Sequence, residues 1–489
     1  MSVPTDHTFG GVPEQEWPTS LDNGGCLIWS GAEQAGLWDN DVQNGIWPRS
    51  YTVWIVAVWI ALLIIRPWEV LFPSWGSLHI ERVYAIFAIA AVFLSGQLRF
   101  SPSFQTTGLL LLALGLGVST ACALDPARAW ECLYVYLTIF AFYFVLLSVV
   151  RTPYQLVFLV AIYVVVMAAF LAKAQWEYFL HEAGGFSMGV PRLRGINLTS
   201  GHPNAVAAIT VMSLSFLWFL WRVRETFTST WPTFWRRSFP RGLAIYAYLA
   251  FSSVVMTNSR SGMLGIVVFV VLTALSLGYV RRVLVAAAFG SLLLAATWIA
   301  MPEESKTRLQ SSWDPSVGGE SARMSAEGRI VGLKQGMEMF RRFPVTGVGP
   351  ANFQPYRISH LDGTNLVAHN IVGAVLGETG LVGGLAFLVF ISGVFVNCRR
   401  TKQLAAQQPA VDVHVMKELA VACRNSLVLI LFLGMFGDQQ RTMQLYWVAA
   451  FCLLAYTLAR ASTERSFASE DANCLAAVST DTRKDPGET

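Results

Sequence analysis

Residues 244–277 read AIYAYLAFSSVVMTNSRSGMLGIVVFVVLTALSL, two apolar runs joined by the turn TNSRSG at 257–262. With its flanking residues, each run approaches the roughly 17 to 25 residues that a helix needs to cross about 30 Å of hydrocarbon. The stretch therefore predicts two membrane helices that reverse at one face of a bilayer. The turn carries Arg260, whose guanidinium keeps its charge in proteins. Arg260 is either a turn residue that snorkels to the membrane surface or a ligand for an anion at that face.

The composition extends the membrane prediction to most of the chain. Of the 489 residues, 54% are apolar and only 13% are charged, whereas soluble proteins carry about 25% charged residues. The apolar runs are continuous, while a membrane β-barrel would alternate apolar and polar residues in short segments. The sequence therefore predicts an all-α polytopic membrane protein in contact with membrane lipids.

Other classes of partner and site are disfavoured. The formal net charge of +4 is small and the charges are scattered among loops, so we expect no nucleic-acid partner. None of the seven cysteines forms a CxxC pair, and several lie in or beside apolar spans. They are typical of small packing residues, and we expect no metal and no cofactor.

About twelve transmembrane helices are expected, with boundaries uncertain by several residues. The spans run roughly over 51–71, 82–96, 107–123, 130–150, 154–177, 203–221, 242–257, 262–279, 283–301, 369–397, 422–437 and 442–460. They predict a polar cytoplasmic tail at 1–50, transmembrane helices 1–9 at 51–301, a large external loop at 302–368, transmembrane helices 10–12 at 369–460 and a cytoplasmic tail at 461–489.

Lysines and arginines in the short loops predict the orientation, because such loops stay in the cytoplasm. Basic residues gather at 222–241, at 281–282 and at 399–417, three loops that a twelve-span arrangement places on one side. That side should be cytoplasmic, together with both tails. The 302–368 loop and the Arg260 turn then face the periplasm or the cell exterior.

The external loop contains a candidate amphipathic helix. The stretch EGRIVGLKQGMEMFRR at 327–342 spaces apolar side chains as on one face of a helix: Ile330, Leu333, Met337 and Phe340. This pattern predicts a helix that lies on the membrane face or caps a cavity. Gly332 and Gly336 weaken the helix intrinsically, so it should depend on packing.

Four polar regions fall at span ends on the predicted external face. They contribute Arg192, Arg194 and Asn204 from PRLRGINLTSGHPN (191–204), Arg260 from the turn, Arg329 from the loop helix, and His369 with Asn370 at the start of the tenth span. Each also has an ordinary structural role, as a loop charge or as a helix-start residue. The span after 191–204 opens at Pro203, with Thr199 or Ser200 as its expected cap.

Together these side chains suit a substrate that carries phosphate. Guanidinium groups bind phosphate oxygens through paired hydrogen bonds and keep their charge in a partly dry site. His369, whose ordinary pKa is near neutrality, can take a proton from a hydroxyl. The acidic residues nearest to it, Asp362 and Glu378, are less well placed as bases. The alternative is a charged His369 that adds a further cation to the anion site.

Three stretches resemble the signature of the O-antigen ligase and O-antigen polymerase family: TNSRSG (257–262), GRIVGLKQGMEMFRRFPVTGVGPANF (328–353) and AHNIVGAVLGETGLVGG (368–384). The upstream RLRGINLTSGHPN (192–204) is similar to the arginine turn of that family. The clear resemblance covers about residues 190 to 390. The order of the parts, an arginine turn, a large external loop and a His-Asn pair at the next span, is more specific than any single motif.

The resemblance implies a metal-independent glycosyltransferase of GT-C-like fold in the bacterial cytoplasmic membrane, with its site facing outwards. Its donor would be a glycan on an isoprenoid diphosphate, usually undecaprenyl diphosphate. The acceptor would be a lipid A core sugar in a ligase, or another lipid-linked glycan in a polymerase of cell-surface polysaccharide. The family's essential arginines correspond to Arg194 and Arg260, and its essential histidine to His369. We also expect Arg192 to bind the diphosphate, with support from Asn204, Arg329 and Asn370.

A secondary transporter or flippase for a lipid-linked glycan is the alternative class. Transporters place ionisable groups and broken helices near the bilayer midplane, often in repeated halves. Here the charges cluster at span ends on one face and no repeat is evident, which favours the enzyme. Ligases, polymerases and protein-O-glycosylating members of the family share these motifs, so the acceptor stays open at this point.

Overall fold

The fold is known from a computed structural model, which describes residues 42–43, 46–71, 80–180, 185–187, 190–196, 201–277, 320–408, 410–437 and 439–481, with a few isolated positions between 284 and 310. Most of the expected N-terminal tail at 1–50, the predicted ninth span at 283–301 and the first part of the external loop lie outside the described residues.

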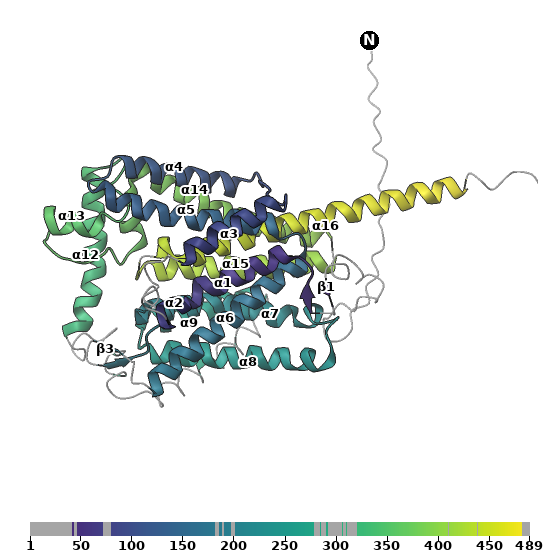
Figure 1. Cartoon of the computed structure of the whole chain (residues 1–489), viewed down its shortest axis with the longest axis horizontal. Coiled ribbons are helices and arrows are strands. Elements are labelled where there is room, and N and C mark those ends of the chain that lie inside the picture. Colours follow the sequence, from purple (N-terminus) through teal and green to yellow (C-terminus); the bar gives the residue numbers. More distant parts are fainter. Residues whose placement is uncertain are drawn as a thin grey trace, which may run out of the picture.

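Helices make up nearly all of the described secondary structure (Figure 1). They are α1 (Tyr51–Ile65), α2 (Pro67–Leu71), α3 (Ile80–Leu94), α4 (Phe104–Ala121), α5 (Pro126–Val149), α6 (Pro153–Leu180), α7 (Pro203–Phe227), α8 (Thr233–Met256), α9 (Arg260–Ser276), α12 (Glu320–Arg342), α13 (Phe353–His360), α14 (Ile371–Gln407), α15 (Val411–Gly434), the 3-10 helix η2 (Gln439–Arg441) and α16 (Met443–Asp481). Two short antiparallel hairpins pair β1 (Val42–Gln43) with β2 (Trp47–Pro48) and β3 (Gly185–Ser187) with β4 (Val190–Arg192).

Eight helices of the described residues are long and apolar enough to cross a membrane. They are Tyr51–Glu69, Phe104–Ala121, Pro126–Val149, Pro153–Leu180, Pro203–Phe227, Thr233–Met256, Ile371–Gln407 and Met443–Ser466. α9 is a shorter apolar helix. The prediction of an all-α polytopic membrane protein is confirmed. The count of about twelve spans stays a prediction, because the 283–301 segment is not among the described residues.

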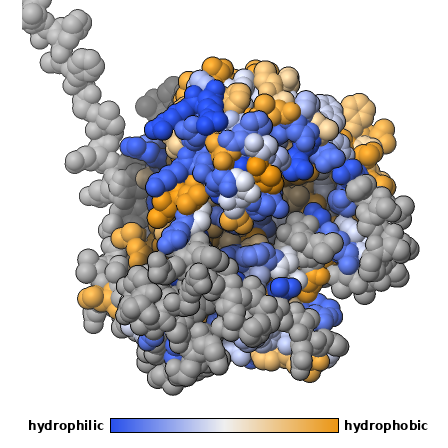
Figure 2. Space-filling view, turned by 90° about the vertical axis from the view of Figure 1, so that its left-hand side faces the viewer, coloured by the Kyte–Doolittle hydropathy of each residue, from blue (hydrophilic) through white to orange (hydrophobic). Residues whose placement is uncertain are grey.

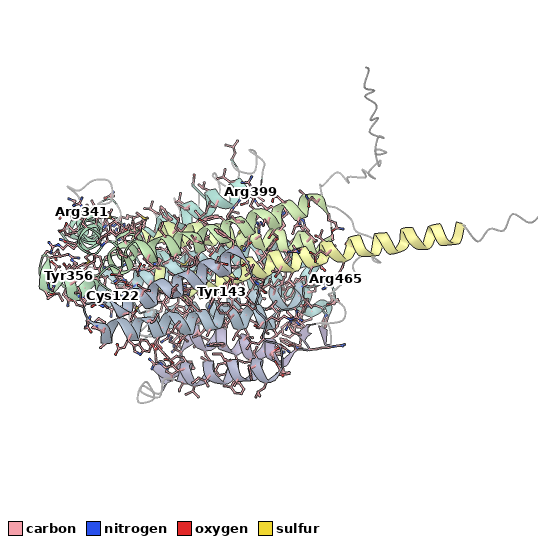
Figure 3. The ribbon with its side chains drawn as sticks, turned by 90° about the horizontal axis from the view of Figure 1, so that it is seen from above. Cys122, Tyr143, Arg341, Tyr356, Arg399 and Arg465 are labelled. Atoms are coloured by element: carbon pink, nitrogen blue, oxygen red, sulfur yellow. The ribbon has the colours of Figure 1, made fainter. Side chains whose placement is uncertain are left out.

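The long helices lie side by side along the longest axis of the molecule, and α12 stands across one end of them (Figure 1). α13 lies at the same end, and α16 runs out beyond the bundle at the other. Seen from above, Cys122, Arg341 and Tyr356 lie at the α12 end, whereas Arg399 and Arg465 lie toward the opposite end (Figure 3). The assignment of the two ends to the two membrane faces stays a prediction from the basic loops.

Small residues let α4 and α14 pack backbone to backbone. A Cβ added at Gly108 would lie 2.7 Å from the backbone of Phe390, and one added at Gly393 would lie 2.6 Å from the Cα of Gln105. Close approach through small residues is the usual way in which helices associate within lipid, where apolar side chains gain little by leaving the solvent.

α14 is broken near its start, where the sequence predicted one continuous span. Gly380 has φ 61° and ψ −156°, outside the helical region. The loop at 344–349 lies against the break, and the backbone N–H of Leu381 donates to the carbonyl of Pro344 at 2.8 Å. The N–H of Gly349 donates to the carbonyl of Glu378 at 2.9 Å. The loop thus supplies partners for backbone groups that the break would otherwise leave unpaired within the membrane.

The predicted loop helix is present, because α12 includes all of 327–342. Its most buried residues are Gly332, Gly336 and Met339, whereas Ile330 is 60% exposed. The expected apolar face therefore needs correction. The glycines were expected to weaken the helix, but they are its contact surface: a Cβ added at Gly336 would lie 2.4 Å from the carbonyl oxygen of Gly373 on α14.

Two further boundaries differ from the expected spans. The first span breaks at Arg66, which ends α1 with φ 46° and separates it from α2. The last helix, α16, continues to Asp481, well beyond the expected end at 460. Much of the segment predicted as a C-terminal tail is therefore helical.

Candidate functional site

A cavity of about 430 Å³ opens where the helix ends meet at the α12 end of the bundle. Polar residues from five separate segments line it: Arg66, His202, Asn204, Ser261, His369, Gln439 and Arg441. Apolar residues such as Phe436 and Trp447 complete its wall. Figure 2 looks onto this end of the molecule, where hydrophilic residues gather.

The segment around β4 is docked on the Arg260 turn. The backbone N–H of Leu193 donates to the carbonyl of Met256 at 2.9 Å. The side-chain amide of Asn258 donates to the carbonyl of Pro191 at 2.9 Å. These bonds bring the two arginine-bearing stretches of the sequence together, as the sequence predicted from their shared membrane face.

Arg192 joins this segment to both neighbours. Its side chain is 1% exposed. Its Nε donates to the carbonyl of Thr257 at 2.8 Å, and its Nη2 donates to Oδ1 of Asn204 at 2.7 Å. The guanidinium therefore holds the Arg260 turn against the start of α7. Arg194, two residues further on, is exposed.

The turn presents Arg260 at the first position of α9. Asn258 adopts φ 49°, a conformation that asparagine tolerates better than most residues. Ser259 caps α9, and its Oγ accepts from the N–H of Gly262 at 3.3 Å. Arg260 itself is partly buried, and the next residue, Ser261, lines the cavity.

His369 lies at the start of α14 with φ 48°, a sparsely populated region for a residue with a Cβ. It is partly buried and lines the cavity. Asn370 caps α14, because its Oδ1 accepts from the N–H groups of Val372 and Gly373 at 3.0 and 3.1 Å. The helix-start role that the sequence allowed for Asn370 is thus confirmed.

Burial and nearby guanidinium groups set the charge of His369. Its pKa is lowered from the ordinary value first by burial, and then by Arg329 and Arg357. The imidazole is therefore neutral at pH 7. Burial and the charge of Arg260 in turn lower the pKa of Arg329, whose guanidinium lies 5.2 Å from the ring centre of Phe436. Arg260, Arg329 and His369 are thus neighbours in one electrostatic cluster.

A second histidine, His202, was not among the residues singled out in the sequence. It lines the same cavity and caps α7, because its Nδ1 accepts from the N–H of Asn204 at 3.2 Å. The expected caps, Thr199 and Ser200, are therefore wrong. The available signal was its position directly before Pro203, since proline favours the first turn of a helix and the preceding residue then caps it.

The acidic residues closest to His369 in the sequence are both paired with arginines. Asp362 accepts from Arg357, which is 2% exposed and also donates to the carbonyl of Leu366 at 3.2 Å. Arg357 thus fixes the segment that leads to His369. Glu378 is buried and pairs with Arg441 at 2.5 Å.

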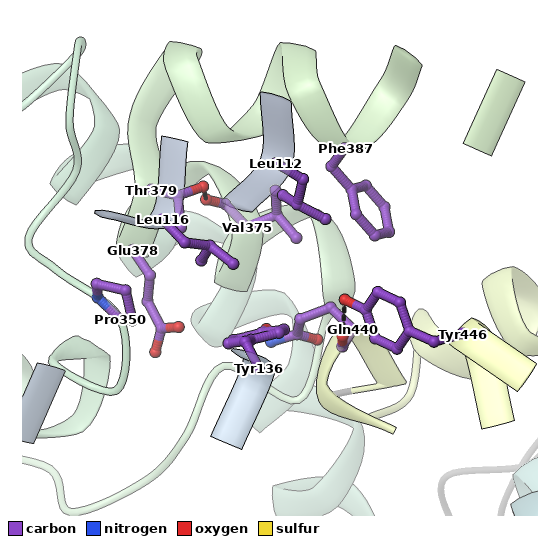
Figure 4. A pocket seen from close by; sticks show the side chains of 10 residues that line it. All are labelled: Leu112, Leu116, Tyr136, Pro350, Val375, Glu378, Thr379, Phe387, Gln440 and Tyr446. Atoms are coloured by element: carbon purple, nitrogen blue, oxygen red, sulfur yellow. Dashed lines mark hydrogen bonds between the residues drawn. The ribbon is translucent and has the colours of Figure 1, made fainter. Parts of the chain in front are cut away.

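The Glu378 carboxylate lies at a small pocket between Pro350 and Tyr136 (Figure 4). Its partner Arg441 lines the large cavity, so the ion pair joins α14 to the cavity wall. No group of three histidine, cysteine or acidic residues with an arrangement suited to a metal ion occurs in the described part of the chain.

A family model described as O-antigen ligase matches residues 245–388. The matched part includes the Arg260 turn, α12 with Arg329, and the His369 segment. Four of the residues discussed above lie before the matched part in the sequence: Arg192, Arg194, His202 and Asn204. His202 and Asn204 line the cavity, and Arg192 donates to Asn204. The comparison with curated proteins gave no match.

Proposed function

We propose that this membrane protein transfers a glycan from an isoprenoid diphosphate donor to a sugar hydroxyl, because residues 245–388 match a family model described as O-antigen ligase. The observation that supports the proposal best is the cavity itself. His369 lines it together with Arg66 and Arg441. Arg329, which lowers the pKa of His369, is itself an electrostatic neighbour of Arg260. We expect undecaprenyl diphosphate as the donor lipid. We also expect the whole chain to have a GT-C-like fold with about twelve spans.

In this proposal Arg260 binds the donor diphosphate, with Arg194 and Arg329 as further cations. Arg260 and Arg329 are close enough for one charge to lower the pKa of the other. Two guanidinium groups held together would both attract the negative charges of a diphosphate. The leaving diphosphate gains negative charge as the glycosidic bond breaks, so fixed guanidinium groups stabilise the transition state.

His369 acts as the general base. The acceptor oxygen attacks the anomeric carbon while its proton passes to a ring nitrogen of His369. The bond between the anomeric carbon and the phosphate oxygen breaks, and the diphosphate leaves with the electron pair. Attack from the side opposite to the leaving group inverts the anomeric centre. The neutral state that burial, Arg329 and Arg357 favour is the state that a base requires.

Arg192 and Asn204 have a positioning role in this scheme. The buried guanidinium of Arg192 donates to Thr257 and to Asn204, so it fixes the turn that carries Arg260. Asn370 positions His369 in the same way, by capping α14. The diphosphate contact expected of Arg192 from the sequence is thus better assigned to Arg194, which is exposed.

We place the site at the periplasmic face of the bacterial cytoplasmic membrane. The cavity is at the α12 end of the bundle, away from Arg399 and Arg465, and three of its lining residues, Ser261, Val367 and His369, lie in the family-matched segment. The acceptor is either the lipid A core, as in a ligase, or a second lipid-linked glycan, as in a polymerase. The two forms share the donor site described here and differ in the acceptor.

The test is glycan transfer by the purified full chain in liposomes, with a glycan on undecaprenyl diphosphate as donor. Arg260→Lys keeps the charge but loses the planar fork, and we expect the barrier to rise by on the order of 2–4 kcal/mol, a loss of roughly 30- to 1,000-fold in rate. Arg341→Lys is the matched control, because Arg341 is 77% exposed on α12 at the same end of the molecule. A wild-type rate in Arg260→Lys would contradict diphosphate binding by Arg260.

A further inference from the structure

The second histidine of the cavity has no role in the scheme above. His202 and His369 both line the cavity, although they come from the starts of two different helices, α7 and α14. They are close enough that His369 contributes to lowering the pKa of His202. Because His369 is the proposed base, the second imidazole of the cavity needs a different role.

Hydrogen bonding fixes the tautomer of His202. Its Nδ1 accepts from the backbone N–H of Asn204 at 3.2 Å, so this nitrogen carries no hydrogen in the neutral ring. The hydrogen must then be on Nε2, at the far side of the ring. A histidine held in this way is a hydrogen-bond donor at Nε2 and has no free basic nitrogen.

The surroundings of His202 favour the neutral ring. Its pKa is lowered by burial first, and then by Arg192, His369 and Arg194. The two arginines come from the β4 segment, and their charges repel a proton. Protonation at Nδ1 would also break the cap of α7. Burial and the cap of α7 therefore both favour the neutral ring of His202, with its hydrogen on Nε2.

We propose that His202 is a substrate-contacting residue that donates its Nε2–H to an oxygen of the donor diphosphate. His202 lines the cavity together with Asn204, the partner of Arg192. Arg194 acts on the ring electrostatically from the same segment as Arg192, so we expect an anion drawn to Arg194 to meet the ring. The proposal rests on the diphosphate-binding function argued above, and it gives the two histidines different roles. His202 binds the leaving group, and His369 takes the proton of the acceptor.

Two substitutions separate the cap from the proposed contact. The amide of an asparagine overlies the Nδ1 side of a histidine ring, so His202→Asn keeps a cap acceptor for Asn204 and loses the Nε2–H donor. The longer amide of a glutamine reaches the Nε2 position, so His202→Gln keeps the donor and loses the cap. The thermal midpoint of each variant reports whether the cap of α7 persists.

The experiment measures binding of undecaprenyl diphosphate to the full chain in detergent, and transfer from the lipid-linked glycan across pH. We expect His202→Asn to keep the wild-type thermal midpoint and to lose roughly tenfold or more in affinity, with the acidic limb of the pH profile unchanged. His202→Gln should bind the lipid within about threefold of the wild-type affinity.

Three outcomes would overturn the assignment. If His202→Asn binds and transfers as the wild type does, His202 only caps α7. If His202→Asn transfers poorly but binds undecaprenyl diphosphate normally, the contact is not with the diphosphate. If the acidic limb moves in His202→Asn, His202 is a proton carrier instead. A wild-type chain that neither binds this lipid nor transfers from it would instead refute the proposed function, before any variant is compared.

Discussion

Strained backbone positions concentrate at the proposed site. Four non-glycine residues in the described part of the chain have positive φ: Arg66, Asn258, Ala351 and His369. Arg66 and His369 line the cavity. Asn258 lies in the turn before Arg260, next to Ser259, the cap of α9. Such conformations cost on the order of 1–3 kcal/mol each. They persist where surrounding contacts stabilise them. At Asn258 such a contact is the hydrogen bond from its side chain to the carbonyl of Pro191.

The pKa of His369 leads to a prediction about pH. A base must be neutral, so transfer should rise with pH, and the midpoint of the rise should lie below the ordinary imidazole pKa of about 6.5, because burial, Arg329 and Arg357 lower the pKa of His369. Arg329→Gln removes one of these charges, so the pKa of His369 should rise and the acidic limb should move to higher pH. The transfer rate of the reconstituted protein, measured between about pH 5 and 8, gives the position of the acidic limb in the wild type and in Arg329→Gln. A rate that falls from pH 6 to 8 would exclude the base role and favour the cationic one.

Neighbouring arginines at 192 and 194 should respond differently to the same substitution. Arg192→Lys cannot bridge Thr257 and Asn204 at once, so we expect the free energy of unfolding to fall by about 1–3 kcal/mol. Arg194 is exposed, so Arg194→Lys should leave stability unchanged and raise the KM for the lipid-linked donor. Thermal unfolding and donor titrations distinguish the two. Equal loss of stability in both variants would contradict the positioning role of Arg192.

At the scale of elements, the sequence predicted the helices better than their contacts. The apolar spacing in 327–342 identified a helix, and α12 is there. The pattern did not identify its contact face, because that face is made of glycines rather than large apolar side chains. Gly332 and Gly336 pack on the start of α14, and a pattern of hydrophobic residues does not register residues without side chains.

The break in α14 was likewise beyond the local sequence. Gly380 lies in an apolar run that is typical of a continuous span, and its unpaired backbone groups are satisfied by residues 344–349. Gly347 has φ 69°, and a Cβ there would lie 2.3 Å from the carbonyl carbon of Glu378. The break in α14 thus depends on a contact between two segments. The hydrophobic pattern of either segment alone does not predict that contact.

The glycine contact of α12 provides a matched test. Gly328 and Gly336 are both within α12, but a Cβ added at Gly328 meets nothing within 4 Å, whereas one at Gly336 lies 2.4 Å from the carbonyl oxygen of Gly373. Gly328→Ala should stabilise the helix by about 0.5–1 kcal/mol, with normal transfer. Gly336→Ala should cost about 1–3 kcal/mol.

Gly336→Ala should also lower transfer, because Arg329 lies two helical turns away on the same face of α12 and moves with it. Thermal unfolding and transfer rates of the two alanine variants give the comparison. Similar behaviour of both variants would show that the close approach of α12 to α14 is not needed for the site.

At the scale of the whole molecule, the sequence predicted that residues far apart along the chain share one face of the membrane. Arg194, Arg260 and His369 were assigned to one membrane face from the short-loop charges and from the family resemblance, and the structure gathers their segments at one end of the bundle. His202 was not predicted, because the hydroxyl side chains of Thr199 and Ser200 are the more usual caps and stand close before the same helix. The Glu378–Arg441 pair escaped because its partners are 63 residues apart and no local pattern joins them.

The orientation of the bundle can be tested with a native cysteine. Cys122 is exposed and lies at the α12 end of the molecule (Figure 3). If that end faces the periplasm, a membrane-impermeant thiol reagent should label the wild-type chain in sealed spheroplasts, and Cys122→Ser should abolish most of the labelling. Cys398, Cys423 and Cys452 are buried and should contribute little.

Arg399 supplies the matched position at the opposite end, where it is exposed. Arg399→Cys in the Cys122→Ser background should stay unlabelled in sealed spheroplasts and react once the membrane is opened. The expected pattern follows from the basic loops, since lysine and arginine in short loops are retained in the cytoplasm. The reverse pattern would place His369 and the arginine cluster in the cytoplasm. A lipid-linked glycan presented at the outer face could not then reach the cavity, and the transfer reaction proposed here would have to be abandoned even if every side chain in the site were correctly identified.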